Sequence, residues 1–428
     1  MRAERRALAG EPGSRSGDPR RLAAQLRELV PAPESVKDAV AEIIARVRAD
    51  GDGAVIDYTR RFDTAGAPPG PLVAADRELD AAARALDPAV RAGLQHAIEN
   101  VERVACEALR QDRTVDLTGH QVVLREAPVD RAAIYVPGGR APYPSTVVMG
   151  VIPARAAGVE HVAVCAPPAR DGRVDSVVLA ACRLAGAGTV YAIGGAQAIA
   201  ALAYGTESVS PVDVIVGPGN LYVQEAKLQV FGQVGIDGFA GPSDLVVIAD
   251  GDADPGPLAL DLLAQAEHGP GTLVIGISPS AALLDRLQER LQSAPDTGAV
   301  ACLVEVTDAG AAGELANAIA PEHLQLVGRH AERLAPGIRH AGCVFVGAAA
   351  ATAFGDYIAG SNHILPTAGA ARYASALTPA HFRRSFTEVR IGHRAAAPLA
   401  RAAAPVARAE GFEQHARSME ARIGDNGP

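Results

Sequence analysis

The feature that most limits the fold of this chain is a regular alternation of short β-rich runs with helical stretches, which begins near residue 132. Helical spacing fills the gaps between the runs, for example over Ser145–Ala157 and Val174–Ala185. A strand–helix–strand rhythm predicts parallel sheets with helices on both faces. The predicted strands are Ala132–Val136, His161–Cys165, Thr189–Ile193, Asp213–Val216, Leu245–Ala249, Leu273–Ile277, Cys302–Val306, Leu324–Val327 and Val344–Val346.

The rhythm predicts an α/β protein with two tandem three-layer domains, similar in architecture to a Rossmann fold but without its glycine fingerprint. We expect residues 36–134 plus 243–381 to form the first α/β domain and residues 135–242 to form the second. Residues 1–35 are expected to be an extension that begins as a frayed tail. Up to about residue 115 the chain is predicted to be mostly helical, with Ser35 and Asp87 as helix caps.

The C-terminal segment, residues 382–428, is expected to be a small tail, with one possible strand over Phe382–Ile391 and helical spacing over Ala395–Arg422. The helical part has too few apolar residues to hold a core of its own. Such a segment must dock on its own chain or on a neighbouring one.

Composition excludes several classes of protein. The 428 residues carry a net charge of −9 with no basic block, which argues against a nucleic-acid partner. No apolar run reaches the roughly 18 residues of a membrane span. The five cysteines are scattered and mostly lie in apolar runs, so we expect reduced thiols and a cytoplasmic protein. The chain has only two lysines, Lys37 and Lys227, which we interpret as coding bias.

One short loop gathers an unusual set of polar side chains. Between Phe354 and Pro366 the chain places a carboxylate (Asp356), an amide (Asn362) and an imidazole (His363). Glycines within this loop allow tight turns, and the proline prevents a helix from continuing. Ordering so polar a loop is costly unless its side chains bind something, so we expect a site here.

Three further polar groups are candidates for the same site, namely Gln265–His268, Pro321–His323 and Glu410–His415. Gln265 and His268 are three residues apart near the end of a predicted helix, and therefore share a face. They could be two metal ligands or simply a polar helix end. Glu322 and His323 precede a predicted strand, where adjacent side chains point apart. Each could carry out its own proton transfer, or both could be surface charges in a loop.

The ligand types favour a transition metal. Asp356 offers an oxygen, and His363 and His415 offer nitrogens, a mixture that suits Zn²⁺, Mn²⁺ or Co²⁺. The signal is weaker than a pair of Cys-x-x-Cys motifs, because these groups are far apart in the sequence.

Glycine-rich turns follow several predicted strands, at Val136–Gly139, Ile193–Gly195 and Val216–Asn220. In a parallel sheet these turns lie at the carboxyl ends of the strands, where ligands bind. Glycines there let the backbone approach a phosphate, and the helix N-termini that follow favour its charge. A nucleotide crevice is therefore expected, although the usual G-x-G-x-x-G fingerprint is absent.

Taken together, these motifs closely resemble the histidinol dehydrogenase family. The resemblance runs in the family's order from about Val36 to Arg422. The matching segments are Ile134–Gly139, Ile193–Ala198, Val216–Asn220, Ala240–Ser243, Gln265–His268, Ala320–His323, Gly355–Tyr357, Asn362–Thr367 and Glu410–His415.

The resemblance implies a zinc- and NAD-dependent oxidation of L-histidinol to L-histidine through a bound aldehyde, catalysed by a homodimer with shared active sites. The zinc ligands that it implies are Gln265, His268, Asp356 and His415, with His415 supplied by the other subunit. The NAD contacts that it implies, within the second domain, are Tyr135, Gln197 and Asn220. The substrate contacts that it implies are Ser243, Glu322, His363 and Glu410, together with the zinc ligands.

The resemblance also assigns the chemistry: His323 would remove the hydroxyl proton, and Glu322 would activate water for attack on the aldehyde. Three positions depart from the family pattern, namely Gly269, Asp244 and the segment Leu377–Phe382. They leave open a related zinc dehydrogenase of another amino alcohol or polyol. A zinc hydrolase and a catalytically inactive binding protein are the alternatives from other classes.

Overall fold

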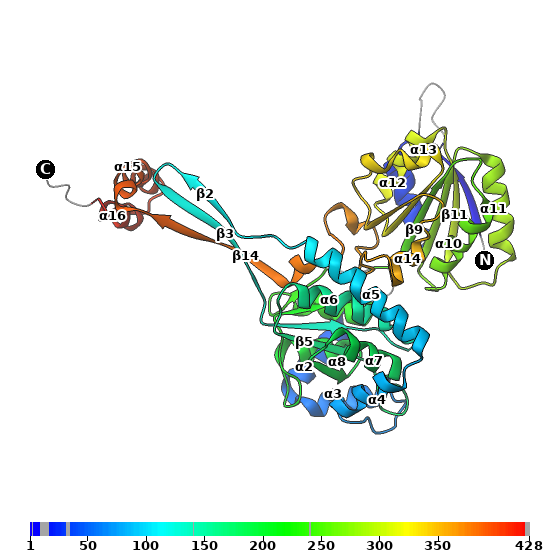
Figure 1. Cartoon of the computed structure of the whole chain (residues 1–428), viewed down its shortest axis with the longest axis horizontal. Helices are drawn as coiled ribbons and strands as arrows, with labels where there is room; N and C mark the ends of the chain where they lie inside the picture. The colour runs from blue at the N-terminus through cyan, green and yellow to red at the C-terminus, as the bar shows by residue number, and fades with distance from the viewer. Residues whose placement is uncertain (2, 9–16, 31–34, 140, 239–240, 424–428) are drawn as a thin grey trace. The chain divides into compact units, whose positions relative to one another are not determined.

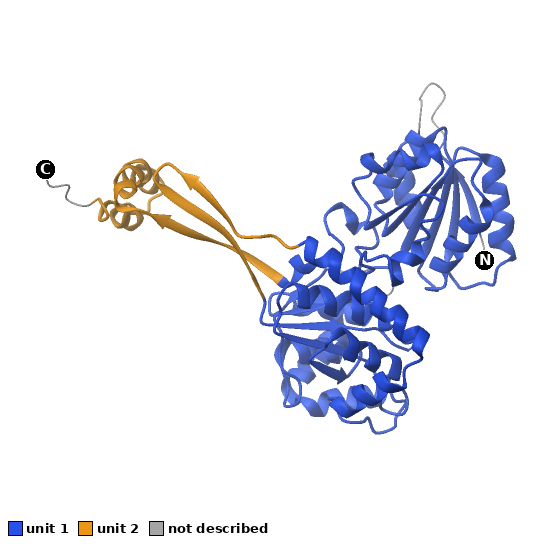
Figure 2. Ribbon diagram, in the orientation of Figure 1, with its two compact units in different colours: residues 1–108, 129–382 blue, residues 109–128, 383–428 orange. Residues whose placement is uncertain are grey.

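The computed structural model describes residues 1, 3–8, 17–30, 35–139, 141–238 and 241–423. The chain divides into two compact units, coloured separately in Figure 2. Unit 1 comprises residues 1–108 and 129–382, and unit 2 comprises residues 109–128 and 383–428.

The larger sheet of unit 1 has six parallel strands in the order β1-β11-β10-β9-β12-β13 (Figure 1). Its central strands are almost fully buried because helices cover both of its faces. The strands are β1 (Ala3–Ala7), β9 (Asp244–Ala249), β10 (Leu273–Ser278), β11 (Val300–Glu305), β12 (His323–Val327) and β13 (Cys343–Val346). The helices after them are α10 (Pro255–Ala266), α11 (Ala281–Ser293), α12 (Ala309–Ile319), α13 (Arg329–Glu332) and α14 (Thr352–Tyr357).

The expectation of a frayed N-terminus is wrong for the described part of that segment. Residues Ala3–Ala7 add β1 to the edge of the six-stranded sheet, beside β11. Helix α1 (Pro19–Arg27) then buries Leu22 and Leu26 in the core of the same sheet. The helix has the caps that sequence rules require, because Asp18 accepts a hydrogen bond from the Arg20 amide and Pro19 opens the first turn.

The smaller sheet of unit 1 has five parallel strands in the order β6-β5-β4-β7-β8. The strands are β4 (Arg131–Tyr135), β5 (His161–Ala166), β6 (Thr189–Ala192), β7 (Val214–Val216) and β8 (Gly235–Ile236). The chain runs outward from β4 through β5 to β6 and then returns to place β7 on the other side of β4. The switch point of this sheet therefore lies between β4 and β7.

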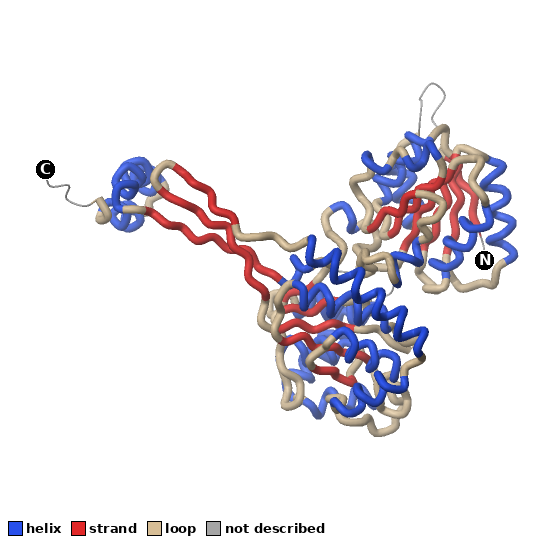
Figure 3. Tube along the Cα trace, viewed as in Figure 1, coloured by secondary structure: helices blue, strands red, loops and turns tan. Residues whose placement is uncertain are grey.

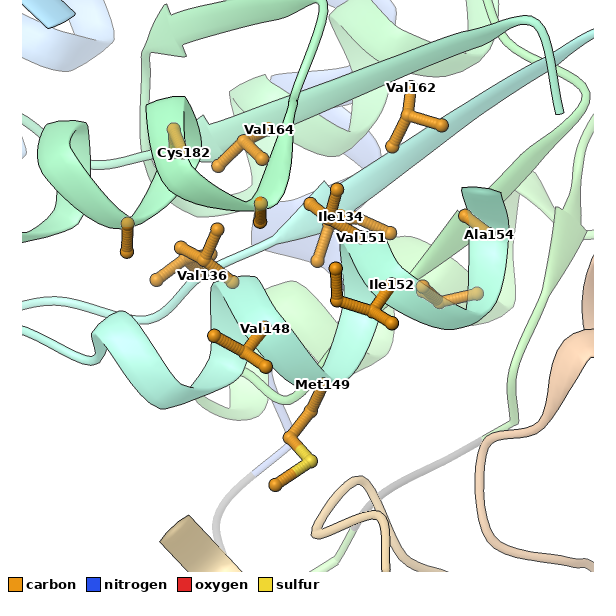
Figure 4. Close-up of a cluster of buried hydrophobic side chains, with 14 of the residues drawn as sticks. Ile134, Val136, Val148, Met149, Val151, Ile152, Ala154, Val162, Val164 and Cys182 are labelled. Carbon is orange, nitrogen blue, oxygen red and sulfur yellow. The ribbon is translucent and has the colours of Figure 1, made fainter. Parts of the chain in front are cut away.

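Helix α6 (Pro144–Ala156) is apolar on every side, which is typical of a helix buried between layers. Figure 4 shows its Val148, Val151 and Ile152 among side chains of β4 and β5. Gly150 is required at the crossing, because a Cβ there would lie 2.3 Å from Cγ2 of Ile134. The other helices that connect these strands are α7 (Ser176–Ala185), α8 (Gly195–Tyr204) and α9 (Leu221–Val230).

The structure groups the helical N-terminal region differently from the predicted domains. Its helices pack on the five-stranded sheet: Val40 and Tyr58 share a core with Ile199, while Leu94 and Val101 pack with the core of α6. Strand β4 also belongs to this sheet rather than to the other domain. Apolar spacing predicted the helices but carries no information about which sheet buries them. These helices are α2 (Lys37–Asp50), α3 (Asp52–Phe62), α4 (Asp76–Ala85) and α5 (Pro88–Glu107).

Unit 2 is built on an antiparallel sheet of three strands in the order β14-β3-β2 (Figure 3). Strand β14 (Arg383–Ile391) matches the predicted strand, whereas β2 (Arg113–Leu117) and β3 (His120–Pro128) were not predicted. Two helices follow, α15 (His393–Ala409) and α16 (Glu413–Glu420), which contact each other. The expectation of an α/β fold with parallel sheets is confirmed. Among the described residues, no helix is both long enough and apolar enough to cross a membrane.

Candidate active site

The first group of predicted site residues meets at the amino ends of two neighbouring strands, β9 and β12. These strands pair in parallel with His323 beside Leu245, so the residues that open each strand are brought together. Ser243 and Asp244 come from the start of β9, and Glu322 and His323 come from the start of β12.

Glu322 is the centre of this group, and only 7% of it is exposed. Its Oε2 accepts hydrogen bonds from the Ser243 hydroxyl and, at 3.0 Å, from the Asp244 amide. Burial raises the pKa of Glu322 to about 7, against the opposing effect of nearby His323. A carboxylate with such a pKa changes protonation state near neutral pH, which suits a general base.

The ion pair between Asp244 and Arg27 supports the backbone of Glu322. Asp244 Oδ1 accepts from the Glu322 amide at 2.7 Å, while Oδ2 accepts from the Ala368 amide at 3.2 Å and pairs with Arg27 at 3.2 Å. Burial raises the pKa of Asp244, and Arg27 opposes that shift. Helix α1 therefore contributes a cation to the support of the site, although its segment was expected to be a tail.

His323 lies between two carboxylates and is 2% exposed. Its Nδ1 is 3.8 Å from Glu322 Oε2, and its Nε2 is 3.4 Å from Asp356 Oδ1. Burial by itself would lower the pKa of His323, but Glu322 and Asp356 outweigh it and raise that pKa. The expectation that the Glu322 and His323 side chains point apart is wrong, because Glu322 lies at a bend just before β12 begins.

A glycine allows Asp356 to reach His323. The Phe345 ring stacks on the His323 ring with centroids 5.9 Å apart. A Cβ on Gly355 would lie 2.5 Å from Cζ of Phe345, so only glycine lets the short helix α14 pack there. The next residue, Asp356, is thereby placed beside the imidazole.

His363 is tied to the same region through both ring nitrogens. Its Nδ1 is 2.9 Å from the Asp356 carbonyl oxygen, which can only accept, so this nitrogen carries the proton. Its Nε2 is 3.2 Å from the Thr146 hydroxyl. Burial lowers the pKa of His363, which favours the neutral ring that this arrangement needs. Asn362 fixes the loop by donating to the Met149 carbonyl at 2.7 Å.

Gln265 lies in the last turn of α10, which Asp254 caps at its start, and His268 lies in the turn just after the helix. Gln265 is buried, and its Nε2 donates to Ser243 Oγ at 2.5 Å. The amide oxygen of Gln265 is then the atom left for another partner, and an oxygen is what a cation takes. His268 is exposed and influences the pKa of His363, which places it in the same neighbourhood.

The expected zinc ligands are divided between the two units. Gln265, His268 and Asp356 belong to it, whereas His415 belongs to helix α16 of unit 2. Among the residues that the structure describes, no three His, Cys, Asp or Glu side chains are grouped as a metal site. Glu410 and His415 are both exposed, and the His415 ring lies 5.2 Å from the Phe412 ring.

The second candidate site is a cavity of about 960 Å³ associated with the five-stranded sheet. Its lining includes the predicted NAD contacts Tyr135, Gln197 and Asn220. Tyr135 ends β4 and Asn220 follows β7, the two strands that flank the switch point, whereas Gln197 lies in α8 after the edge strand β6. The cavity therefore lies where parallel sheets bind ligands.

The lining of this cavity has the features of a nucleotide site. Both amide atoms of the buried Gln197 lack a hydrogen-bond partner among the described residues. The Gly195 amide donates to the Tyr135 hydroxyl at 3.0 Å, which fixes the turn into α8. A Cβ on Gly194 would lie 2.5 Å from Cβ of Pro167, so glycine is needed for this close approach. Unsatisfied amide atoms beside a glycine turn fit a bound polar ligand.

The loop between β7 and α9 is held by a buried lysine. Lys227 is 1% exposed, donates to the Gly217 carbonyl at 3.0 Å and forms an ion pair with Asp237. Asp237 in turn accepts from the Gly217 amide at 2.7 Å. The pair thus secures both polar groups of Gly217, three residues before Asn220. Lys227 therefore has a structural role, whatever the reason for the small number of lysines in the chain.

Sequence reasoning missed several residues that the structure places at these sites. Arg27, Asp244 and Thr146 support the first site, and Lys227 with Asp237 supports the second. Lys227 gave no clear signal, because its helix also contains Gln224, Glu225 and Gln229. No local signal marks Arg27, whose partner is 217 residues away.

Known proteins match this chain over most of its length. The model of the family described as histidinol dehydrogenase matches residues 30–423. Histidinol dehydrogenase of Pseudomonas aeruginosa is 44% identical over 406 residues, which cover 92% of each chain. That of Parasynechococcus marenigrum is 43% identical and covers 91% of this chain and 92% of its own.

A solved structure agrees with the sequence relatives. Histidinol dehydrogenase from Elizabethkingia anophelis superposes with a TM-score of 0.89 at 29% identity, and covers 99% of this chain and 98% of its own. The match thus extends over both units and both candidate sites. The chain therefore belongs to the histidinol dehydrogenase family.

Proposed function

We propose that this protein oxidises L-histidinol to L-histidine in two successive NAD⁺-dependent steps, with the aldehyde kept bound between them. The observation that carries the proposal is the buried arrangement of Ser243, Glu322 and His323 at the amino ends of β9 and β12. Family membership supplies the substrate class, and the cavity at the switch point supplies a place for the coenzyme.

His323 is the base for the hydroxyl proton of the alcohol. The carboxylates of Glu322 and Asp356 stabilise the imidazolium that forms when the ring accepts this proton, as its raised pKa indicates. Glu322 then takes a proton from the water that attacks the aldehyde carbon. Its pKa of about 7 makes it a stronger base than an exposed carboxylate and leaves it ionised in part at neutral pH.

Ser243 orients Glu322. Its hydroxyl donates to the carboxylate and accepts from the Gln265 amide, so the three side chains form one hydrogen-bonded chain. His363 and Glu410 are the proposed additional contacts to the substrate. For His363 this requires an exchange of the Thr146 hydrogen bond for one to the substrate.

We assign Gln265, His268 and Asp356 as zinc ligands, together with His415 of the partner subunit. A zinc ion bound there would act as a template that holds the imidazole and amine of L-histidinol. The mixed oxygen and nitrogen donors of these residues fit zinc. A homodimer with shared sites, in which each subunit supplies His415 to the other, would complete the set.

NAD⁺ bound in the cavity of the five-stranded sheet would accept the hydride in each step. Tyr135, Gln197 and Asn220 are its proposed contacts. The amide of Gln197, unpartnered among the described residues, can both donate to and accept from the coenzyme.

The test uses the purified full-length protein with L-histidinol and NAD⁺, before and after treatment with a chelator. We expect NADH formation that the chelator abolishes and added zinc restores. Metal analysis of the His268→Ala variant should show a clear loss of bound zinc relative to the parent. Retention of all the zinc would contradict the ligand assignment, and activity with other amino alcohols but not histidinol would contradict the substrate.

A further inference from the structure

A carboxylate with no assigned role lies in the wall of the nucleotide cavity. Asp63 follows the last residue of α3, and its amide donates to the Thr59 carbonyl at 2.9 Å, which completes the helix. Its Oδ2 is buried and has no hydrogen-bond partner among the described residues. A buried carboxylate oxygen without a donor is costly, so its retention requires an explanation.

The position of Asp63 relative to the five-stranded sheet explains why a buried carboxylate is kept there. Asp63 lies against Gly194, where a Cβ would be 3.1 Å from Asp63 Oδ1 and 2.5 Å from Cβ of Pro167. Pro167 is the residue that follows strand β5, the neighbour of β4 on the side away from β7. Asp63 therefore stands at the carboxyl end of the strand next to the switch point.

In dinucleotide-binding sheets, an acidic residue near this position accepts hydrogen bonds from the ribose of the adenosine half. Strand β5 itself brings no acid there, because the residues after it are Pro167, Pro168 and Ala169. Asp63 reaches the same place from a helix that precedes the sheet in the sequence. The surrounding groups, Tyr135 and Cys165, have raised pKa values and carry no charge that could pair with it.

We propose that Asp63 binds the hydroxyls of the adenosine ribose of NAD⁺ and makes the cavity prefer NAD⁺ to NADP⁺. The assignment rests on the proposed function in that it takes the cavity to be the coenzyme site. A carboxylate accepts hydrogen bonds from a pair of neighbouring hydroxyls, so the ribose would supply donors to the Asp63 carboxyl in the cavity wall. The 2′-phosphate of NADP⁺ removes one hydroxyl and brings a negative charge against the carboxylate.

A different contact would have a different signature. If Asp63 accepted from the adenine amino group, both coenzymes would depend on it equally, because they share that group. The ribose assignment requires instead that NAD⁺ lose affinity while NADP⁺ does not. The ratio of the two affinities therefore separates the two readings.

The experiment measures binding of NAD⁺ and of NADP⁺ by titration calorimetry to the full-length protein and its variants. Asp63→Asn keeps the shape and removes the charge, and Asp63→Ala removes both. Glu42→Gln is the matched control, because Glu42 is a carboxylate that lines the same cavity from α2 and is exposed. Circular dichroism spectra and unfolding midpoints confirm that each variant is folded.

We expect both Asp63 variants to bind NAD⁺ about tenfold more weakly or worse, which is the loss typical of a hydrogen bond to a charged group. Their NADP⁺ affinity should stay the same or increase, so the preference for NAD⁺ falls at least about tenfold. Glu42→Gln should change neither affinity by more than about twofold. Equal losses for the two coenzymes, or no loss in either Asp63 variant, would overturn the assignment.

The binding assay also separates this assignment from the proposed function. Parent protein that binds NAD⁺ but oxidises no histidinol would overturn the function, and the ratio of affinities would still decide the role of Asp63. Parent protein that binds neither coenzyme would overturn the role of Asp63 together with the coenzyme site.

Discussion

Replacement of Asp63 by asparagine is predicted to stabilise the protein without coenzyme, and increasingly so as the pH rises. Burial raises the pKa of Asp63 to about 6 from an ordinary 3.8. Below pH 3.8 the carboxyl is protonated in both the folded and the unfolded state and contributes nothing. Between the two pKa values the folded state binds more protons, so folding becomes less favourable as the pH rises.

The size of the effect follows from the two pKa values. The difference of about 2.2 units corresponds to about 3 kcal/mol lost above pH 7, at 1.36 kcal/mol per unit. About half of that loss falls between pH 5 and pH 7.5, so the advantage of Asp63→Asn should grow by about 1.5 kcal/mol across this interval. Asparagine does not titrate, so its own burial adds only a constant.

Urea unfolding of the parent and of Asp63→Asn at pH 5, 6, 7 and 7.5 measures this difference. The groups around Asp63 are Tyr135 and Cys165, which are neutral. The other charged residues of the cavity are present in both proteins, so their own contributions to the free energy of unfolding are removed when the two proteins are compared. Those residues are Glu42, Arg61, Arg170 and Asp175.

A difference that stays constant over this range would refute the reasoning. An advantage of the parent that grows with pH would show that Asp63 has a cationic partner, and would contradict the orphaned carboxylate directly. Saturating NAD⁺ should stabilise the parent more than Asp63→Asn, because binding supplies the missing donors.

Three further outcomes follow from the same structure. Glu322→Gln should slow oxidation of the aldehyde about 100-fold or more but reduce oxidation of the alcohol much less, since glutamine cannot deprotonate water; equal rates with histidinal would contradict this. Lys227→Met should lower the free energy of unfolding by about 3–5 kcal/mol, because it leaves Asp237 buried without its cation. A loss below about 1 kcal/mol in urea unfolding would contradict the stabilising role of the Lys227–Asp237 ion pair. An equal mixture of subunits carrying His415→Ala and subunits carrying His323→Ala should recover about a quarter of the parent activity, because about half of the dimers are then heterodimers and each holds one intact site of two. No recovery after confirmed subunit exchange would reject shared sites.

The parts of the fold that sequence predicted are those in which local pattern decides the structure. Continuous apolar runs such as Leu245–Ala249 became buried parallel strands, and Asp87 before Pro88 fixed the start of α5. The sequence pattern did not predict which sheet each helix packs on. Helices α2 to α5 joined the five-stranded sheet because their apolar faces complement it, and that choice depends on three-dimensional packing.

Strands β1 and β2 escaped prediction for a related reason. Residues Ala3–Ala7 read AERRA, with no apolar alternation, and become a strand only because β11 offers an unpaired edge. Strand β2 is exposed along its whole length, so burial leaves no periodic signal in its sequence. Register with a partner, rather than apolar content, defines both elements.

The candidate site shows the same division. Motifs identified Glu322, His323 and Asp356, because unusual polar clusters are visible locally. The groups that support these residues and set their pKa values could not be identified from the sequence. Arg27 is 217 residues from its partner Asp244, and the pKa of Glu322 is raised mainly by its burial. Long-range contacts of this kind appear only once the chain is folded.

The most direct test of the proposed function is the number of NADH molecules formed for each molecule of L-histidinol consumed. The reaction is run to completion with limiting L-histidinol and excess NAD⁺, and the product is identified by mass. The proposal predicts two NADH per histidinol with L-histidine as the product. A ratio of one, with an aldehyde as the product, or no NADH at all would contradict it.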